Sequence, residues 1–210
     1  MGRYAGAVCR LCRREGMKLY LKGEKCYTEK CPVHKRQGTP PGMHGARPTR
    51  RKASEFGMRL REKQKLRRIY GIYETQFKNY FQQAARAKGV TGTRLLQLLE
   101  LRLDNVVYRL GLATSRAEAR QLVAHGHITV DGRKVTIPAY QLRSGQQVGL
   151  TAQGHQHARI KELLAAPPRG TPAWLEAAAD RTGGRILALP ARDEIDVPIQ
   201  EQLIVEYYSR

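Results

Sequence analysis

The sequence has few acidic residues for its size. Its 210 residues include 38 Lys and Arg but only 18 Asp and Glu, which leaves a formal net charge of +20 at pH 7. Mutual repulsion makes such a surplus costly unless a polyanion is the normal partner. The composition therefore favours nucleic-acid binding, and 41% hydrophobic residues suffice for one or two domains with a modest core.

Long apolar runs are also missing. No window approaches the roughly 20 apolar residues that span a bilayer, and the amino terminus lacks the apolar run of a signal peptide. A membrane-surface protein would need an apolar helical face or a lipidation signal beside its charge, and the sequence shows neither. We therefore expect a cytoplasmic protein with no membrane partner.

The positive charge is unevenly distributed along the chain. Residues 1–70 hold 20 basic and 5 acidic side chains, a surplus of 15, whereas residues 151–210 hold 7 basic and 8 acidic ones. The first third should therefore supply most of the attraction for nucleic acid. The last quarter suits contact with protein or solvent.

Cysteine is absent after residue 31. The four cysteines form two close pairs, Cys9-x2-Cys12 and Cys26-x4-Cys31. This pattern predicts a structural tetrahedral zinc site, whose four protein thiolates leave no position for catalysis. A four-iron four-sulfur cluster on the same cysteines remains an alternative, and His34 could replace one thiolate. The cysteines could also stay as buried thiols, whereas disulfides are disfavoured in a reducing compartment.

Basic residues crowd around the cysteines and continue into an extended arm. The cysteine segment has few large apolar side chains, so metal binding would supply its folding energy. The arm over residues 37–52 is rich in Pro and Gly, and it is either a disordered linker or a segment that folds on RNA. The RNA-binding candidates in these two segments are Arg10, Arg13, Arg14, Arg47, Arg50, Arg51 and Lys52.

A basic helix is predicted over residues 55–70, with Ser54 as its N-cap. Only Glu55 and Glu62 compensate its positive charge within the helix, which favours contact with phosphates over a solvated charged face. The candidates are Arg59, Arg61, Lys63, Lys65, Arg67 and Arg68.

Two further helices are predicted before residue 102. In the first, apolar residues at helical spacing indicate core positions and Gly89 can supply the C-cap. The second begins near Thr93 and is apolar almost all round, which places a domain boundary near residue 98. The core candidates of the first of these helices are Phe77, Tyr80, Phe81, Ala84 and Ala85.

Residues 99–150 are predicted to form a compact helix-helix-sheet module. The spacing of Ser115 and Glu118 is that of a capping box, which starts the second helix. Asp131-Gly132 is a strong hairpin-turn signal, with strands expected around residues 128–130, 135–137 and 148–150. The expected inward-facing residues of the helices are Val106, Val107, Leu110, Ala119, Leu122 and Val123.

One face of this module is predicted to bind nucleic acid. Arg116 and Arg120 are neighbours on the outer face of the second helix, and guanidinium groups bind phosphate with two parallel hydrogen bonds. His125 and His127 are equally explained by a helix end, which favours His without any ligand. The candidates are Arg102, Asn105, Arg109, Ser115, Arg116, Arg120, Gln121, His125 and His127.

Several long motifs carry a resemblance to a known family. They are the cysteine region, Pro-Pro-Gly-Met-His-Gly-Ala-Arg at residues 40–47, Leu-Arg-Glu-Lys-Gln-Lys-Leu-Arg-Arg-Ile-Tyr-Gly at 60–71, Leu-Asp-Asn-Val-Val-Tyr-Arg-Leu-Gly at 103–111, Ser-Arg-Ala-Glu-Ala-Arg-Gln-Leu-Val at 115–123, and the closing ten residues. These motifs resemble the bacterial family of small (30S) ribosomal subunit protein four. Some members lack the cysteines. The module from residue 99 also resembles domains of tyrosyl-tRNA synthetases and pseudouridine synthases.

The resemblance implies a structural constituent of the small ribosomal subunit and no small-molecule substrate. It implies binding to the five-helix junction in the 5′ domain of 16S ribosomal RNA early in assembly. It also implies contacts with small-subunit protein five and other 30S proteins, a position near the messenger RNA entry channel and a contribution to translational accuracy. An RNA-modifying enzyme and a zinc-bearing regulator of messenger RNA or DNA remain alternatives, although residues 151–210 are too few for a separate catalytic domain.

The predicted fold class is α+β. It combines a mostly helical first domain bearing an amino-terminal four-cysteine metal knuckle with a small helix-helix-β-sheet RNA-binding domain inserted before the carboxyl-terminal segment. The expected ranges are 1–45 for the knuckle and arm, 46–98 for the helical domain completed by about 177–210, and 99–176 for the RNA-binding module and following linker.

Overall fold

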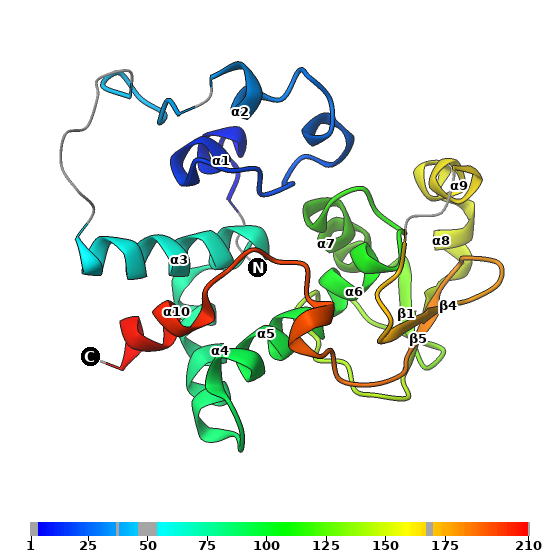
Figure 1. The fold of residues 1–210 in the computed structure, drawn as a ribbon. Helices are drawn as coiled ribbons and strands as arrows, with labels where there is room; N and C mark the ends of the chain where they lie inside the picture. The colour runs from blue at the N-terminus through cyan, green and yellow to red at the C-terminus, as the bar shows by residue number, and fades with distance from the viewer. Residues whose placement is uncertain (1–3, 37, 46–53, 167–169, 210) are drawn as a thin grey trace. The chain divides into compact units, whose positions relative to one another are not determined.

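A computed structural model of the chain describes residues 4–36, 38–45, 54–166 and 170–209 (Figure 1). The chain divides into two compact units, one made of residues 1–92 with 198–210 (unit 1) and one of residues 93–197 (unit 2). The chain returns to unit 1 at Pro198 and not near residue 177, because residues 175–186 add two strands to the sheet of unit 2.

Unit 1 is helical in its described residues. Its elements are α1 (Cys9–Glu15), the 3-10 turn η1 (Gly23–Cys26), α2 (Pro32–Lys35), α3 (Glu55–Ile69), α4 (Glu74–Arg86) and α10 (Glu201–Tyr208), and the division between the units falls within α5 (Thr91–Glu100). As predicted, Ser54 caps α3, its Oγ accepting a hydrogen bond of 3.1 Å from the backbone N–H of Gly57.

The core of unit 1 forms where α10 packs beside α3 and α4. The Tyr208 ring lies 4.6 Å from the ring of Phe81 and 6.1 Å from that of Phe77, while Leu66 and Ile204 are fully buried. Phe77, Tyr80, Phe81 and Ala84 are buried as predicted, but Ala85 is exposed. The predicted C-cap at Gly89 is wrong, because the extended backbone of Ala87 ends α4 earlier.

Unit 2 contains a five-stranded antiparallel sheet in the order β2-β1-β3-β5-β4. Its helices α6 and α7 precede the sheet, and α8 and α9 follow its third strand in the chain (Figure 1). The elements are α6 (Leu103–Arg109), α7 (Arg116–Ala124), β1 (Ile128–Val130), β2 (Arg133–Lys134), β3 (Gln147–Leu150), α8 (Ala152–Gln156), α9 (Ala158–Ala165), β4 (Leu175–Ala177), β5 (Gly184–Ile186) and the 3-10 turn η2 (Arg192–Glu194).

The turn between β1 and β2 forms as the sequence predicts. Asp131 and Gly132 have φ values of 48° and 75°, and two successive positive values are what a type I′ hairpin turn requires. The return strand predicted around residues 135–137 is wrong, because β2 is Arg133–Lys134, residues 135–137 lie in no strand and Ile137 is 57% exposed. The predicted capping-box N-cap is also present, because Ser115 Oγ accepts from the Glu118 N–H at 3.3 Å.

The segment after residue 150 is more structured than a linker. The hydrophobic core that holds the predicted inward residues of α6 and α7 also contains three later residues. They are Ile160 on α9, Trp174 directly before β4, and Ile186 on β5. These late residues complete the core because β5 pairs with β3 and brings β4 with it. The sequence shows neither strand clearly, as each is three residues long.

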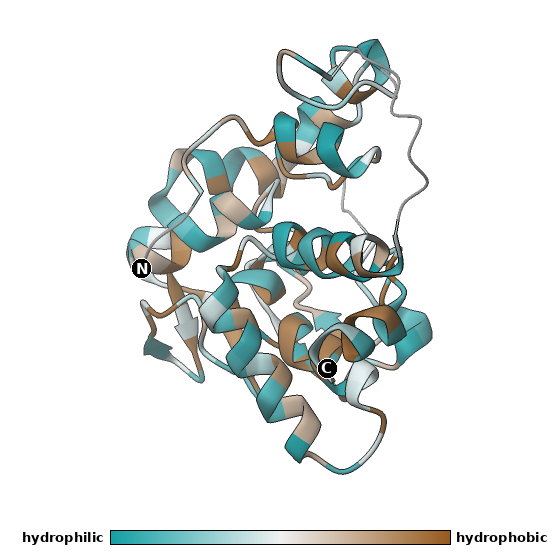
Figure 2. Ribbon diagram, turned by 90° about the vertical axis from the view of Figure 1, so that its left-hand side faces the viewer, coloured by the Kyte–Doolittle hydropathy of each residue, from teal (hydrophilic) through white to brown (hydrophobic). Residues whose placement is uncertain are grey.

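The described residues confirm a fold that mixes helices with a small antiparallel sheet. Hydrophilic and hydrophobic residues interleave along the helices, as Figure 2 shows. In the described part of the chain, no helix has the length and apolar character needed to cross a membrane.

Candidate nucleic-acid interface

The basic residues of α3 lie in ion pairs with carboxylates from distant parts of unit 1. Glu15 at the end of α1 is 1% exposed and pairs with Arg68 and, at 3.4 Å, with Arg61. Burial raises the pKa of Glu15, an effect that Arg68 opposes, and burial also lowers the pKa of Arg68. Two predicted phosphate contacts thus anchor α1 to α3.

Two other carboxylates neutralise much of the remaining charge on α3. Glu74 lies 2.7 Å from Lys63, which is 4% exposed at its side chain, and 3.7 Å from Arg67. Glu206 of α10 lies 2.7 Å from Arg59. Lys65 pairs with Glu62 on its own helix.

These pairs correct the expectation that α3 lacks compensating charge. Glu55 and Glu62 are its only internal acids, but folding brings in Glu15, Glu74 and Glu206 as well. Most of the basic side chains of α3 therefore bind it to its neighbours inside unit 1, whereas Lys65 pairs within the helix.

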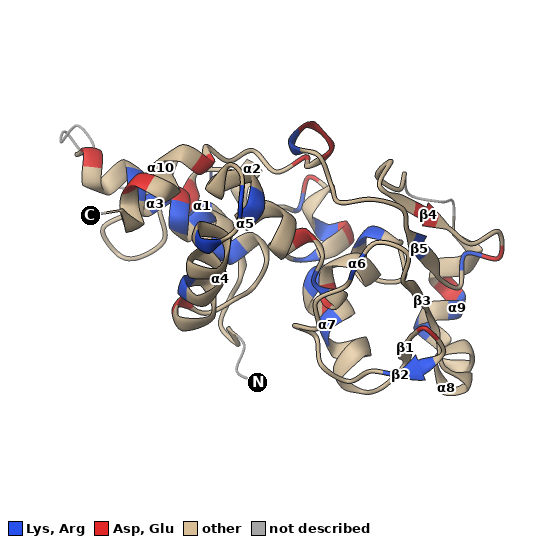
Figure 3. Ribbon diagram, turned by 90° about the horizontal axis from the view of Figure 1, so that it is seen from below, with Lys and Arg blue, Asp and Glu red and all other residues tan. Residues whose placement is uncertain are grey.

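The amino-terminal segment presents more accessible cations. Arg10 and Arg14 are exposed on α1, and Figure 3 shows basic residues along this helix. Arg13 is instead half-buried, because its guanidinium donates to the carbonyl oxygens of Thr39 and Pro40 at 3.1 and 2.9 Å. The predicted contacts Arg47, Arg50, Arg51 and Lys52 lie outside the described residues. Exposed cations that the prediction left out are Lys22, Lys25, Lys30, Lys35 and Arg36.

The four cysteines lie close together in unit 1. Cys12, Cys26 and Cys31 are buried and Cys9 is half-buried, all as free thiols. Burial raises the pKa of Cys12; the backbone N–H of Leu19 opposes this rise and the other three thiols add to it. The Lys22 N–H also donates to the Cys26 Sγ at 3.3 Å. Within the described residues, however, no three Cys, His, Asp or Glu side chains are placed as a group ready to hold a metal ion.

In unit 2, the predicted contact Arg102 is not available to RNA. Its side chain is 1% exposed and donates two hydrogen bonds, of 3.0 and 2.7 Å, to the buried carboxylate of Asp104. Arg120 approaches the same carboxylate at 3.8 Å. A buried guanidinium requires such a partner. Arg102 therefore forms an internal ion pair with Asp104.

A second buried carboxylate, Glu100, holds Asn105 and Arg109. Glu100 is 0% exposed at its side chain and accepts hydrogen bonds of 2.7 Å from Asn105 and of 3.0 and 2.8 Å from Arg109. Burial alone would lower the pKa of Arg109, but Glu100 and then Asp196 raise it well above its ordinary value. The predicted contacts Asn105 and Arg109 are therefore part of an internal network.

This network extends to Arg116 on α7. Asn105 Oδ1 accepts a hydrogen bond of 2.7 Å from Arg116 Nε, and the Arg116 guanidinium lies 4.6 Å from the centre of the Tyr108 ring. Both contacts fix a half-buried guanidinium in one orientation. The interior residues thus position Arg116 at the edge of the module.

Ser115 is buried at the start of α7 and acts as a helix cap. The reciprocal contact of a capping box is displaced by one residue, because Glu118 accepts from the backbone and side chain of Thr114 at 2.6 and 2.5 Å. Ser115 is only 8% exposed and its hydroxyl accepts from the Glu118 N–H, so its role is that of a helix cap and not of an accessible RNA contact.

Accessible polar residues of unit 2 lie at the end of α7 and on the β1–β2 hairpin. Gln121 and His125 are exposed, as predicted, and so are Arg133 and Lys134. These two cations make up β2, which is blue in Figure 3. Sequence reasoning missed the hairpin pair, although Asp131-Gly132 marks the turn that exposes it. The sequence signal for this exposed pair was the position of Arg133 and Lys134 directly after the predicted turn.

Three histidines gather beside this hairpin. The His127 ring lies 6.4 Å from the ring of His125 and 5.0 Å from that of His157. The Nδ1 atoms of His127 and His157 are buried with no hydrogen-bond partner in the described part of the chain. Burial lowers the pKa of His127, and His157, His125 and Lys134 lower it further.

We expect unit 2 to lose stability as the pH falls. The unfolded chain takes up a proton on His127 near its ordinary pKa of 6.5, whereas the folded chain does so only at lower pH. The contribution of neutral His127 to the free energy of unfolding is therefore intact above pH 6.5 and is lost as the pH falls through the lower folded pKa. Urea midpoints followed by the fluorescence of Trp174, the single tryptophan, at pH 7.5 and 5.5 measure it.

The matched variant is His127→Gln, which removes the titrating group. Its midpoint should change less between the two pH values than that of the wild type. An equally large change in the variant would show that other groups cause the acid sensitivity.

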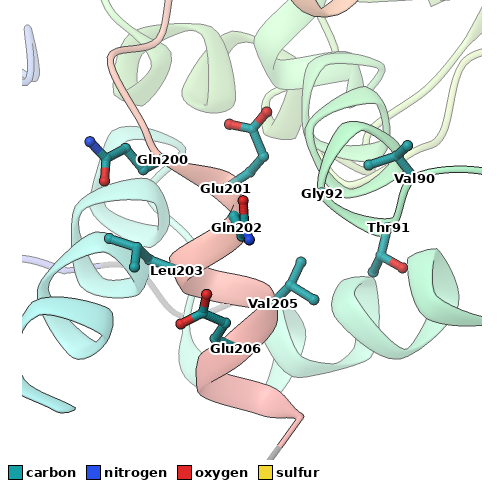
Figure 4. A pocket seen from close by; sticks show the side chains of 9 residues that line it. All are labelled: Val90, Thr91, Gly92, Gln200, Glu201, Gln202, Leu203, Val205 and Glu206. Carbon is teal, nitrogen blue, oxygen red and sulfur yellow. The ribbon is translucent and has the colours of Figure 1, made fainter. Parts of the chain in front are cut away.

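Unit 1 also has a groove of about 570 Å³ between α10 and the start of α5 (Figure 4). None of its described lining residues is basic, and Glu201 and Glu206 lie along it, so a polyanion is not its natural occupant. The lining residues are Val90, Thr91, Gly92, Gln200, Glu201, Gln202, Leu203, Val205 and Glu206.

Comparisons with known proteins cover the chain from end to end. Residues 3–100 match the family model described as "Ribosomal protein S4/S9 N-terminal domain", and residues 101–148 match "S4 domain". The chain is 62% identical over 210 residues to "Small ribosomal subunit protein uS4A" of Symbiobacterium thermophilum. It is 60% and 55% identical over 211 residues to "Small ribosomal subunit protein uS4" of Pelotomaculum thermopropionicum and of Thermodesulfovibrio yellowstonii. Each alignment covers 100% of both chains.

Proposed function

Because the chain belongs to the small ribosomal subunit protein uS4 family, we propose that it is a non-catalytic constituent of the small ribosomal subunit that binds ribosomal RNA. The observation that carries this proposal is the identity of 55–62% over the full length of relatives with that name. The net charge of +20 supports it, since a folded RNA supplies the compensating phosphates.

The described basic side chains fall into two groups, those in ion pairs and those that are exposed to solvent. Those in ion pairs, such as Lys63 and Arg109, stabilise the two units. Arg10 and Arg14 on α1 and Arg133 on β2 are exposed instead, and they would neutralise phosphates. Recognition would follow the shape and phosphate positions of the RNA, because A-form grooves hide base edges from most side chains.

The finer assignments follow from the family resemblance. We propose that the RNA site is the helix junction in the 5′ domain of 16S ribosomal RNA. The partners would be small-subunit protein five and other 30S proteins, with messenger RNA near the entry channel and an effect on translational accuracy. The place of action would be the cytoplasmic ribosome.

We also propose that Cys9, Cys12, Cys26 and Cys31 hold a structural zinc ion. The donor chemistry fits, because four thiols share one small segment, three are buried, and a backbone N–H donates to Cys26 Sγ. A bound zinc ion would supply the folding energy of a segment with little apolar core. A four-iron four-sulfur cluster on the same thiols is the alternative.

Binding to a transcript of the 16S 5′ domain should weaken steeply with salt, and exposed cations should set the slope. Replacing Arg10 and Arg14 by alanine should reduce the slope of log Kd against log salt by roughly 0.7–0.9 for each phosphate that is no longer neutralised. Lys63→Met is the control. Because Lys63 is buried against Glu74, its replacement should leave the slope unchanged. Filter binding at several salt concentrations measures both.

Two results would count against the proposal. If the wild-type chain neither binds the transcript nor cosediments with small subunits at moderate salt, it does not act as a ribosomal constituent. If incubation with the transcript produces stoichiometric modified bases, the chain is an enzyme instead.

A further inference from the structure

Two tyrosines lie side by side on the surface of the cysteine segment of unit 1. The ring centres of Tyr20 and Tyr27 are 5.1 Å apart with an angle of 33° between the ring planes. Tyr20 is 41% exposed and Tyr27 is 64% exposed. This spacing lies within the range of favourable aromatic pairs, and the exposure leaves much of both rings in contact with water.

The loop between the two tyrosines is built to hold this arrangement. The Lys22 N–H donates to Cys26 Sγ at 3.3 Å, and the Tyr27 N–H donates to the carbonyl oxygen of Glu24 at 2.9 Å. Gly23 and Cys26, which belong to this loop, are buried. The two exposed tyrosines therefore flank a compact turn in which Cys26 is buried.

The backbone of Tyr20 is strained. Its φ is 53°, in the left-handed region that bulky side chains rarely adopt and that Gly or Asn occupy with less cost. Such strain at an exposed position points to a function of the side chain, because the ring gains little from burial there.

The surroundings of the pair are strongly basic. The described residues 4–36 contain nine Lys and Arg side chains and three Glu, and one of those acids, Glu15, is buried against α3. Exposed Lys22 and Lys25 lie in the same loop as the tyrosines. Aromatic rings among cations are the combination by which proteins stack unpaired bases while neutralising their phosphates.

We propose that Tyr20 and Tyr27 form a stacking platform for an unpaired base of RNA. This inference rests on the proposed binding of ribosomal RNA and names the chemistry of one contact, a nucleobase π-face against a tyrosine ring. The neighbouring cations hold the adjoining phosphates, and the platform takes any base because every base has a π-face.

The test measures the affinity of the full-length chain for the 16S 5′-domain transcript. Tyr27→Ala should weaken binding roughly five- to a hundredfold, whereas Tyr27→Phe should bind like the wild type, because stacking needs the ring and not the hydroxyl. The slope of log Kd against log salt should stay unchanged, since the substitution leaves every cation in place. Tyr73→Ala is the control, because Tyr73 is 49% exposed on the same unit and lies at the start of α4.

A second variant separates binding from folding. Tyr20→Gly removes the ring but suits the left-handed backbone, so its melting curve by circular dichroism should not fall as its affinity does. Wild-type affinity in Tyr27→Ala, or an equal loss in Tyr27→Phe, overturns the platform. Normal transcript binding combined with poor incorporation into small subunits also overturns it, because the rings would then contact protein. Failure of the wild-type chain to bind the transcript contradicts the proposed function itself.

Discussion

Replacing Glu100 by alanine is expected to destabilise unit 2 by about 3–5 kcal/mol, because it removes one partner of a buried charge pair. Glu100 is fully buried and accepts hydrogen bonds from both Asn105 and Arg109. Without it, Arg109 keeps an ion pair with the exposed Asp196, and the Asn105 amide loses a partner. Urea denaturation followed by Trp174 fluorescence reports this directly, since the tryptophan is 2% exposed in the core of unit 2.

The matched control is Asp196→Ala. Asp196 contacts the same guanidinium at 2.6 Å, but its side chain is 75% exposed, and exposed ion pairs contribute about 0–1 kcal/mol. The contrast between the two variants isolates the effect of burial. A cost below about 1 kcal/mol for Glu100→Ala, where a buried pair should cost several times more, would show that Glu100 is not essential to the network.

Metal removal is expected to unfold the cysteine segment while leaving unit 2 intact. Structural zinc sites contribute about 10–16 kcal/mol of apparent binding free energy near neutral pH, and that energy is folding energy in a segment without its own core. We expect about one zinc ion per chain by elemental analysis, in line with one four-thiolate site. A chelator, or Cys12→Ser with Cys26→Ser, should expose the thiols to a thiol reagent and residues 4–36 to proteases. The Trp174 signal should not change.

His34→Ala provides the control for the identity of the ligands. His34 is exposed, and a site made of four thiolates should keep its metal without it. A brown protein that contains iron would identify the cluster instead of zinc. Protein purified under reducing conditions with no metal and with freely reactive thiols would show that the cysteines serve only as buried side chains.

Local features were predictable from the sequence because they depend on neighbouring residues. Ser54 caps its helix, and Asp131 and Gly132 form a type I′ turn. The spacing of Phe77, Tyr80 and Phe81 marked a buried face. Each of these depends on backbone geometry or periodicity within a few residues.

The sequence by itself thus determined the class of fold, the basic character and the resemblance to a ribosomal protein family, while the tertiary structure decided which charges remain accessible. Glu15, Glu74 and Glu206 reach α3 only through packing, and Arg102 is buried against Asp104 although its residue type predicts an RNA contact. The physical reason is that the environment of a charge depends on distance in space and on exclusion of water. Neither quantity can be read from residue types along the chain.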